Sequence, residues 1–543
     1  MKKILKNAIN EVLAKLNYPH SDIAIQLPKN PEHGDFTTNI AMQLVKTLKK
    51  NPTDIANEII DELLKSYSNI IYSINIAGPG FINIKMNRIN IIAQLIDIIK
   101  SDDKFGQNNK GKNKKAQIEF ISANPTGPLT VGHGRGAILG DVIANILIWS
   151  GYDVEREYYY NNAGKQMSRL GESVKSRYLE LNEVKTDFPN EGYKGEYIIN
   201  IAKDIKELHG PSLINSDNIN FFKEFAEKKI FKNINTTLNK LGLQFDNFFN
   251  ENSLYDSGAI DDVIKKLNKK KLTYKKDGAI WFKASKTGRE QDRVIIKSTG
   301  EPTYRLPDIA YHLNKFNRNY DLIIDILGAD HMDAYPDVLA AIKELGCKLE
   351  KIKIIIHQFV TLVENNEPVK MSTRKAQYIT LDELIENIGI DVVRYFFIMR
   401  GKNSHLNFDL NLARDESDEN PVYYLQYAHA RLSNIIKHAD SQGYALDLNT
   451  DLSLLKLNSE YNLVKALLEF PDVIQKALNS FEPQTISNYL QNIASMFHKY
   501  YAKERVISDN VDLSQARLIL IKSIRIVLFN GLKILGIKAP ERM

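Results

Sequence analysis

The strongest constraint on the fold is an alternation of short apolar strands and amphipathic helices that occurs twice along the chain. The segments AQIEFIS and DVEREYYY flank a helical stretch, and YDLIIDILGAD and KIKIIIHQFV flank another. Parallel strands need such crossover helices, so the pattern predicts two βαβ halves of one parallel sheet. We therefore expect a Rossmann-like α/β domain over residues 106–380, interrupted at about 165–290 by a mostly helical insertion.

Two further regions flank this domain, because a chain of 543 residues is too long for one core. Residues 1–105 combine an amphipathic helix, MKKILKNAINEVLAKL, with two strands around the turn in YSINIAGPGFINIKM, which indicates a small α+β domain. After a connector over 381–420, residues 421–543 carry apolar side chains at helical spacing. This last region is predicted to be an all-α helical bundle.

Composition excludes several classes of protein. Apolar residues make up 43% of the chain and charged residues 25%, as in ordinary globular proteins. A single cysteine, Cys347, excludes a disulfide framework and a multi-cysteine metal site. An isolated HMD has no second His or Cys cluster to support it, so no structural metal is expected. Without a membrane-spanning run or a signal-peptide core, the expectation is a cytoplasmic protein that does not bind membranes. The net charge of +6 permits a polyanionic partner without requiring one.

The segment SANPTGPLTVGHGRGAILGD follows the first strand and runs into a helix. Gly132, Gly134 and Gly136 surround His133 there. Glycines at such a turn let the backbone approach a phosphate, and the helix N-terminus adds free N–H groups. The turn is a candidate nucleotide site, and the alternative is an ordinary tight turn with a surface or core histidine.

A second candidate is the basic loop KMSTRK, which follows the last strand of the second βαβ half. Lys370, Arg374 and Lys375 cluster in it. Ligands of open α/β sheets bind at the carboxyl ends of the strands, where such a loop reaches phosphates. Taken alone, a short basic run is more often a solvated loop.

Together, the two segments resemble the HIGH and KMSK signatures of class I aminoacyl-tRNA synthetases. Flanking segments narrow the resemblance to arginyl-tRNA synthetases of bacterial type: IEFISANPTGPLT, REYYYNNAGKQM, PTYRLPDIAYHL, ILGADHMD, NPVYYLQYAHAR and LGIKAPERM. The match covers almost the whole chain. It implies ATP-dependent activation of L-arginine to arginyl-adenylate, with Mg²⁺ accompanying ATP, and transfer of the arginyl group to the 3′-terminal ribose of tRNA(Arg). The family is usually monomeric.

The resemblance also implies roles for individual residues. The predicted catalytic residues are Thr130, His133, Lys370 and Arg374, and the predicted ATP-binding residues are Gly132, His133, Gly134, Asp330, His331, Lys370, Met371 and Ser372. The predicted arginine-binding residues are Glu119, Ser122, Asn124, Gln166, Tyr304 and Asp308. A guanidinium presents five donors in a fixed fork, which suits carboxylates such as Glu119 and Asp308. The alternative for Asp308 is a first-turn acid that favours the helix dipole behind Pro307.

This chain departs from the family pattern at two motif positions. Thr130 replaces the first HIGH histidine and Thr373 the final KMSK lysine, while Gly127 stands where some relatives carry a compensating lysine. We hypothesise that Arg374 supplies the missing cation. Because of these departures, one alternative is a paralogue that binds tRNA but has lost catalysis. Another alternative is a different enzyme, either a synthetase for another amino acid or another HIGH-type nucleotidyl transferase.

Contacts with tRNA are the last expectation. Tyr423 and Tyr427 at the start of the bundle suit stacking of anticodon-loop bases, and a lysine run over 269–276 suits phosphates. Core tyrosines and a solvated lysine face are the alternatives. The resemblance implies that the N-terminal domain contacts the tRNA elbow near Asp35, Phe36 and Asn39.

Overall fold

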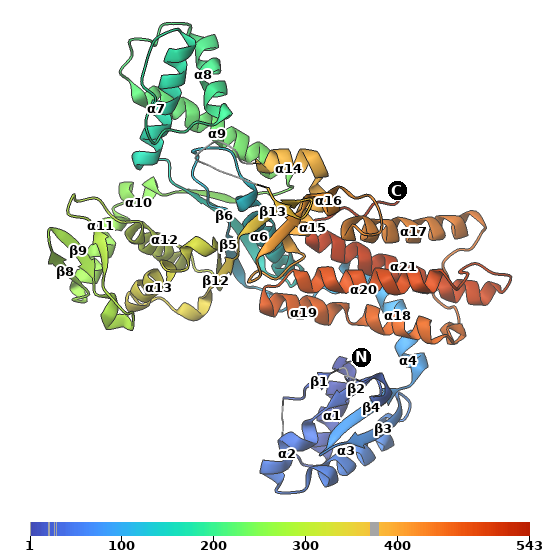
Figure 1. The fold of residues 1–543 in the computed structure, drawn as a ribbon. Coiled ribbons are helices and arrows are strands. Elements are labelled where there is room, and N and C mark those ends of the chain that lie inside the picture. Colours follow the sequence, from blue (N-terminus) through green and yellow to red (C-terminus); the bar gives the residue numbers. More distant parts are fainter. Residues whose placement is uncertain (1, 20–21, 27, 29, 370–378) are drawn as a thin grey trace.

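The computed structural model describes residues 2–19, 22–26, 28, 30–369 and 379–543. The chain builds separate lobes around a central parallel sheet, with the N-terminal domain below and a long helical bundle to the right in Figure 1. The predicted combination of a Rossmann-like domain, an α+β domain and a helical bundle is confirmed.

The central sheet has the order β12-β11-β5-β6-β7, and every neighbouring pair is parallel. Helix α6 (Val131–Trp149) crosses from β5 to β6 and is buried along most of its length. Helix α13 (Tyr335–Glu344) makes the corresponding crossover from β11 to β12, and α12 (Arg305–Asn317) precedes β11 and packs against α13. The strands are β5 (Lys115–Glu119), β6 (Asp153–Tyr160), β7 (Asn247–Asn250), β11 (Leu322–Gly328) and β12 (Ile352–His357).

The predicted single insertion at about 165–290 is wrong in one respect, because β7 inside it is an edge strand of the central sheet. The strand has four residues, NFFN, which are too few to show a periodic pattern. Before β7, helices α7 (Gly164–Leu181), α8 (Glu196–His209) and α9 (Ile219–Lys240) form an arm. After it comes a subdomain whose core is shared with α12 and α13. Its elements are α10 (Asn252–Asp256), α11 (Ala259–Lys269), β8 (Thr273–Lys276), β9 (Ala279–Phe282) and β10 (Arg293–Ile296).

The connector between sheet and bundle contains a second small sheet, of order β14-β13-β15. KMSTRK therefore follows a hairpin and not, as predicted, the last parallel strand, and residues 370–378 lie outside the described part of the chain. The connector elements are β13 (Val360–Glu364), β14 (Glu367–Pro368), α14 (Leu381–Ile388), α15 (Ile390–Ile398), β15 (Leu406–Asp409) and α16 (Leu410–Arg414).

The N-terminal domain packs three helices on an antiparallel sheet of order β1-β2-β4-β3. The predicted stripe of its first helix is buried at Leu5, Ala8, Ile9, Val12 and Leu13, whereas Ile4 at the edge of the stripe is 48% exposed. Its elements are α1 (Lys2–Lys15), β1 (Ile25–Gln26), β2 (Phe36–Thr38), α2 (Ile40–Leu48), α3 (Pro52–Tyr67), β3 (Ile71–Ala77) and β4 (Phe81–Met86).

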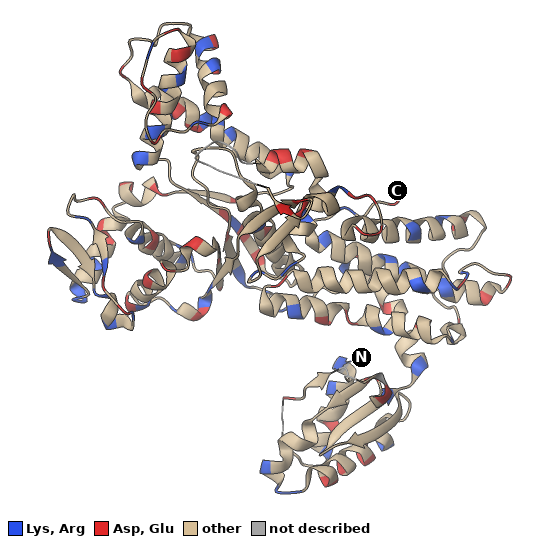
Figure 2. Ribbon diagram, in the orientation of Figure 1, with Lys and Arg blue, Asp and Glu red and all other residues tan. Residues whose placement is uncertain are grey.

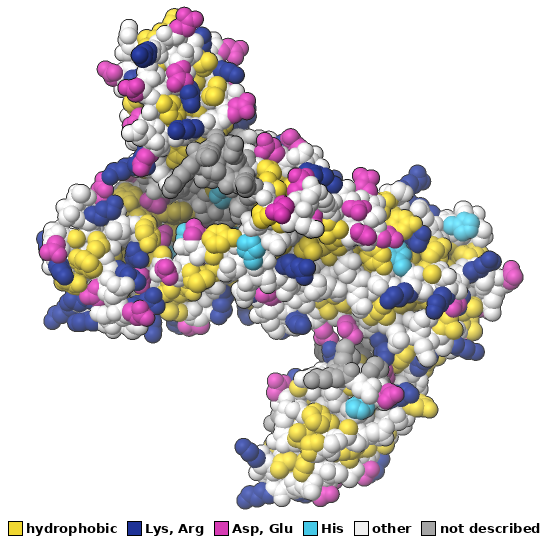
Figure 3. Space-filling view, viewed as in Figure 1, with side chains coloured by type: hydrophobic (Ala, Val, Ile, Leu, Met, Phe, Trp, Pro, Cys, Tyr) yellow, Lys and Arg dark blue, Asp and Glu magenta, His cyan; other side chains and the backbone are white. Residues whose placement is uncertain are grey.

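This domain ends earlier than the predicted residue 105. Helix α4 (Arg88–Ile92) leads out of it, and α5 (Leu95–Ser101) packs against α21 of the bundle. The polar segment that follows is anchored as well, since Phe105 stacks on Phe470 with ring centroids 6.2 Å apart. Figure 3 shows the N-terminal domain as a lobe distinct from the bundle.

A small set of polar contacts fastens that lobe to helix α18 (Asn458–Leu468). The buried carboxylate of Asp35 accepts hydrogen bonds from the Tyr461 hydroxyl at 3.0 Å and from Lys465 Nζ at 3.1 Å. Arg88 lies over the Tyr461 ring at 4.8 Å and donates to the Leu455 carbonyl at 3.2 Å. We call Asp35, Arg88, Tyr461 and Lys465 the domain latch.

The bundle consists of α17 (Pro421–Ser441), α18, α19 (Phe470–Ser480), α20 (Gln484–Tyr501) and α21 (Val511–Leu535). Helix α21 is buried along most of its length, and its last turn bonds to the α/β domain. Asn145 of α6 donates to the Ile534 carbonyl at 3.1 Å, and Arg394 donates to the Leu535 carbonyl at 3.1 Å and to Asp141 of α6. In the described part of the chain, no helix is long and apolar enough to cross a membrane.

Candidate active site

A cleft of about 730 Å³ opens at the carboxyl edge of the central sheet. Ligands of open α/β sheets bind at this edge. Side chains from β5, α6, α12 and the segment after β11 meet there, although more than 200 residues separate the first from the last. Ten of the predicted site residues line it: Glu119, Ser122, Asn124, Thr130, Gly132, His133, Tyr304, Asp308, Asp330 and His331.

The turn after β5 is strained. Ile121 and Ser122 have φ values of +70° and +47°, which are unfavourable for side chains with a Cβ and most of all for a β-branched one. The hydroxyl of Ser122 donates to Glu119 Oε1 at 2.7 Å and accepts from the Tyr159 backbone N–H at 3.2 Å. Such strain persists where the surroundings fix a functional geometry, and here it points Ser122 back at Glu119.

His133 is a neutral hydrogen-bond donor in this geometry. The backbone N–H of Thr130 donates to His133 Nδ1 at 3.1 Å, so the ring proton resides on Nε2. Burial, together with neighbouring His357, lowers the pKa of His133. His133, predicted to be catalytic and to bind ATP, is therefore placed to donate one uncharged N–H in the cleft.

The glycines of the turn differ in what they face. Gly132 lines the cleft. At Gly134 a Cβ would lie 2.7 Å from the Phe397 ring, so this glycine allows α6 to pack on α15 and does not reach the predicted nucleotide site. At Gly136 a Cβ would lie 2.9 Å from His357 Nε2, on the cleft side.

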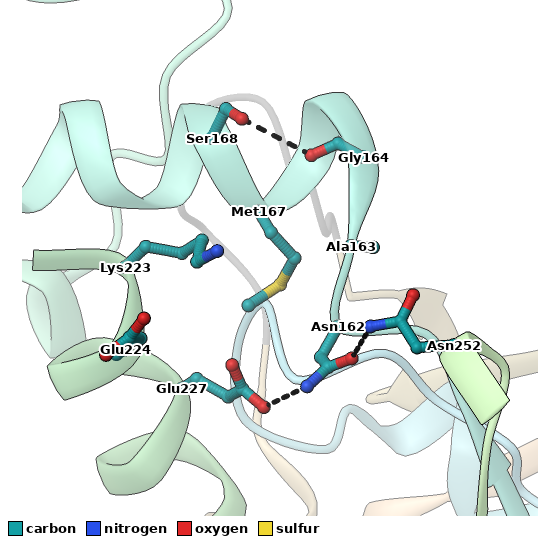
Figure 4. A pocket seen from close by; sticks show the side chains of 9 residues that line it. All are labelled: Asn162, Ala163, Gly164, Met167, Ser168, Lys223, Glu224, Glu227 and Asn252. Carbon is teal, nitrogen blue, oxygen red and sulfur yellow. Dashed lines mark hydrogen bonds between the residues drawn. The ribbon is translucent and has the colours of Figure 1, made fainter. Parts of the chain in front are cut away.

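Asn124 links the first strand to the arm. Its Oδ1 accepts from the Asn161 backbone N–H at 2.9 Å, and its Nδ2 donates to Gln166 at 3.2 Å, which keeps the exposed Gln166 beside the cleft rim. Asn162 turns the other way, into a pocket of about 270 Å³ beneath α7 and α9 (Figure 4). There it donates to Glu227 at 2.6 Å, so it does not share the cleft.

Two acidic side chains form the inner wall of the cleft. Glu119 is only 7% exposed. Asp308, at the first turn of α12, has its pKa raised to about 6 because burial disfavours the charge; His312 partly opposes the shift and Glu119 adds to it. Among the described residues, no cation pairs with the Asp308 carboxylate. This wall therefore suits a cationic ligand.

Beneath the wall lies a group of charges that sequence reasoning missed, and we call His312, Lys315 and Asp325 the pocket floor. Lys315 is fully buried, with its Nζ 2.5 Å from both Glu119 Oε2 and Asp325 Oδ1. Asp325 also contacts His312 Nε2 at 2.8 Å. The only sequence signal for His312 and Lys315 was their spacing from Asp308. The three residues follow one another at intervals of four and three along one helix, so they share a face.

Two more cleft residues were missed. Glu251, directly after β7, accepts hydrogen bonds from the Tyr159 hydroxyl and from Asn161 Nδ2. Burial raises the pKa of Glu251, although both bonds oppose the shift. His357 ends β12 at the same edge of the sheet, and this position was its only available signal.

Three family models match the chain in order. They are described as arginyl tRNA synthetase N terminal domain (residues 1–86), tRNA synthetases class I (R), catalytic domain (94–393) and DALR anticodon binding domain (425–543). A curated arginine–tRNA ligase of Salinibacter ruber is 45% identical over the full length of both chains. The chain belongs to the arginyl-tRNA synthetase family. Its predicted enzyme class, a class I arginine–tRNA ligase, is confirmed.

Two other relatives agree with this membership. The arginine–tRNA ligase of Desulfotalea psychrophila is 48% identical over 96% of this chain and 94% of its own. The crystal structure of a putative arginyl-tRNA synthetase from Campylobacter jejuni superposes with a TM-score of 0.77 at 33% identity, and covers 84% of this chain and all of its own.

The residues predicted to contact tRNA differ in accessibility. Asp35 and Phe36 are 5% and 8% exposed, and Asp35 belongs to the domain latch, so burial removes both from the surface that a tRNA elbow would meet. Asn39 stays partly exposed beside α2, where it accepts from Gln43.

At the bundle, Tyr423 and Tyr427 stack with centroids 6.3 Å apart, and Arg431 lies 4.6 Å over Tyr427. Tyr427 and Arg431 line a groove of about 760 Å³. Partly exposed aromatic and guanidinium groups that share a groove suit stacking of unpaired bases. The lysine run over 269–276 instead lies at the end of the subdomain furthest from the bundle (Figure 2).

The predicted Lys370, Met371, Ser372 and Arg374 lie outside the described residues. A Cβ at Gly127 would lie 3.1 Å from the Tyr197 hydroxyl of α8. A side chain at this position would therefore require the Tyr197 hydroxyl to shift by a few tenths of an ångström.

Proposed function

We propose that this chain is an active arginine–tRNA ligase, which activates L-arginine with ATP and transfers the arginyl group to the 3′-terminal ribose of tRNA(Arg). The observation that carries the proposal is the cleft itself, where the HIGH-like turn stands opposite an acidic wall without a cation of its own at Asp308. A phosphate-binding turn and a guanidinium-binding wall are what the first reaction requires.

In activation, a carboxylate oxygen of arginine attacks the α-phosphorus of ATP. A new P–O bond forms, the bond from that phosphorus to the bridging oxygen breaks, and pyrophosphate leaves. His133 Nε2–H would donate to a phosphate oxygen, with Thr130 and Gly132 shaping the turn. Asp330 and His331 would contribute to the ATP site, and Lys370 and Arg374 with Met371 and Ser372 would bind the phosphates.

Mg²⁺ is proposed to enter as part of the ATP complex. Within the described residues, no three His, Cys, Asp or Glu side chains gather as metal ligands. Mg²⁺ bound to a nucleotide takes most of its ligands from phosphates and water, so such a cluster is not required. The described chain thus fits a metal that is brought by the substrate.

Arginine would be recognised at both of its ends. Its guanidinium would pair with Glu119 and Asp308 beside Tyr304, since two carboxylates match the five donors of the fork. Ser122 holds Glu119. Asn124 and Gln166 would hold the ammonium and carboxylate groups.

The domains divide the work on tRNA. The bundle over 421–543 would stack anticodon-loop bases on Tyr423 and Tyr427, and the N-terminal domain would meet the elbow on its exposed surface near Asn39. We propose a cytoplasmic monomer, in which the domain over 106–380 performs catalysis and 381–420 connects it to the bundle.

Arginine-dependent exchange between ATP and pyrophosphate, measured with and without tRNA(Arg), tests the proposal. We expect exchange only with tRNA present. No exchange in either case would favour the non-catalytic paralogue, and exchange with another amino acid would favour a different synthetase.

A matched pair of variants tests the basic loop. Arg374→Ala should lower exchange by about tenfold or more if Arg374 replaces the missing KMSK lysine. Lys353→Ala, which removes an exposed lysine of β12, is the control. An unchanged rate in Arg374→Ala would reject the assignment.

A further inference from the structure

A continuous chain of hydrogen bonds joins the carboxylate of Glu119 to the main-chain carbonyl of Asp308, the other acidic residue of the wall. It runs from Glu119 through Lys315 and Asp325 to His312 Nε2, and His312 Nδ1 lies 2.7 Å from the Asp308 carbonyl oxygen. Strand β5, helix α12 and strand β11 each supply a member. The two ends of the chain are the cleft residues Glu119 and Asp308, so the pocket floor connects them from behind.

Lys315 restrains Glu119 without using up its acceptors. One oxygen of Glu119 faces Lys315 and the other faces the Ser122 hydroxyl. Each carboxylate oxygen has two lone-pair sites, so one on each remains for a ligand in the cleft. Glu119 is thereby held in a single orientation and can still accept two N–H groups of a guanidinium.

The charges of the floor are balanced and enclosed. Lys315 lies between Glu119 and Asp325, and its side chain has no exposure. Both ring nitrogens of His312 face oxygen acceptors, which favours the imidazolium. Burial alone would lower the pKa of His312, but its hydrogen bond with Asp325 raises it above the ordinary value. Two cations thus offset Glu119 and Asp325, which leaves Asp308 for the substrate.

We propose that Lys315, supported by Asp325 and His312, is a positioning residue for arginine specificity. It fixes Glu119 toward the guanidinium and ties the orientation of Glu119 to that of α12, which carries Asp308. Without Lys315, two buried carboxylates would adjoin with no cation between them, and one would take up a proton. A protonated Glu119 would present a hydrogen-bond donor to the guanidinium, which itself has only donors and needs an acceptor. This inference rests on the proposed function, because it concerns the same pocket.

The test compares Lys315→Met with wild type by calorimetric titration of L-arginine. Methionine keeps an unbranched side chain of similar length but removes the charge. We expect the Kd for arginine to rise by about tenfold or more, while the KM for ATP changes by less than about twofold. An unchanged or smaller Kd, or an equal rise in the KM for ATP, would overturn the proposal.

Arg517→Met is the matched control for a purely structural effect. Arg517 is a nearly buried cation shared by Glu460 and Glu504, far along the bundle. This variant should lose thermal stability as Lys315→Met does, yet keep the arginine Kd of wild type.

A double variant tests whether Lys315 acts through Glu119. Glu119→Gln with Lys315→Met should bind arginine no more weakly than Glu119→Gln alone, since the two changes remove one interaction. Additive losses would overturn the proposal. Where Lys315→Met fails to fold, His312→Gln provides the measurement, with an expected rise in Kd of about threefold or more; an unchanged Kd would again overturn it.

The result is separable from the proposed function. Absence of arginine-dependent exchange in wild type would refute the function. Normal exchange in wild type, together with an unaffected Kd in Lys315→Met, would refute only the positioning role.

Discussion

The pocket floor and the domain latch use the same chemistry in different surroundings. Each centres on a lysine paired with a buried carboxylate, but the Lys315 side chain is fully enclosed whereas the Lys465 side chain is 29% exposed. The floor lies within one domain core, and the latch joins two domains. The difference indicates that one ion pair fixes a ligand site and the other orients a lobe.

Burial determines how firmly each pair holds. Removing one partner of a buried ion pair lowers the stability of the fold by about 3–5 kcal/mol, because the remaining charge is neither paired nor solvated. A pair whose two members are both exposed contributes about 0–1 kcal/mol. The latch joins a buried carboxylate to a partly exposed lysine and is expected to lie between these limits, so it should hold its geometry less firmly than the floor.

The largest expected effect comes from the wall above the floor. Asp308→Asn should raise the KM for arginine by about a hundredfold, because it removes the carboxylate that pairs with the guanidinium. The KM for ATP should change far less. Steady-state kinetics on both substrates measure the split, and Asp321→Asn, on the opposite edge of the sheet, is the control. Equal changes in both constants would contradict the arginine-binding role.

The second effect is a dependence on pH. The pKa of Asp308 is raised to about 6, so its carboxylate is ionised above that pH and protonated below it. The kcat/KM for arginine should therefore fall by about tenfold per pH unit below about pH 6. The same measurement in Asp308→Asn should show a flatter acid limb. A wild-type profile that stays level down to pH 5 would contradict the prediction.

The smallest effect is expected at the latch. Asp35→Asn removes the charge that faces Lys465 and should raise the KM for tRNA by about threefold, with the arginine KM unchanged. Small-angle scattering should also detect a wider range of lobe positions. Asp61→Asn, at an exposed site of α3 in the same domain, is the control. A larger arginine KM in Asp35→Asn would mean that the latch and the cleft are coupled.

The secondary-structure elements that could be predicted have residue patterns that are recognisable without knowing which other segments they pack against. Strand β11 is a run of mostly aliphatic residues that only Asp325 interrupts before Gly328, and the stripe of α1 repeats at helical spacing, so both are visible in the sequence. Strand β7 is too short for a pattern, and it is recognisable only by its pairing with β6.

The cleft residues divide in the same way. His133 and Asp308 lie in motifs, so the resemblance placed them. Lys315 in a helical segment reads as a solvated lysine, because its carboxylate partners come from two strands elsewhere in the sequence. Asp35 reads as an exposed acid after Gly34 for the same reason, since its lysine partner is 430 residues away.

Helix α6 also has a mechanical consequence. Its first turn carries His133, while Asp141 and Asn145 further along belong to the contacts that hold the last turn of α21. The segment from His133 to Asn145 spans about 18 Å at about 1.5 Å per residue. For a rigid rod of that length, a tilt of about one degree displaces the far tip by about 0.3 Å. If the bundle shifts when it binds an anticodon, α6 would tilt with it. The His133 imidazole would then move by a distance comparable to the variation in length that a hydrogen bond tolerates.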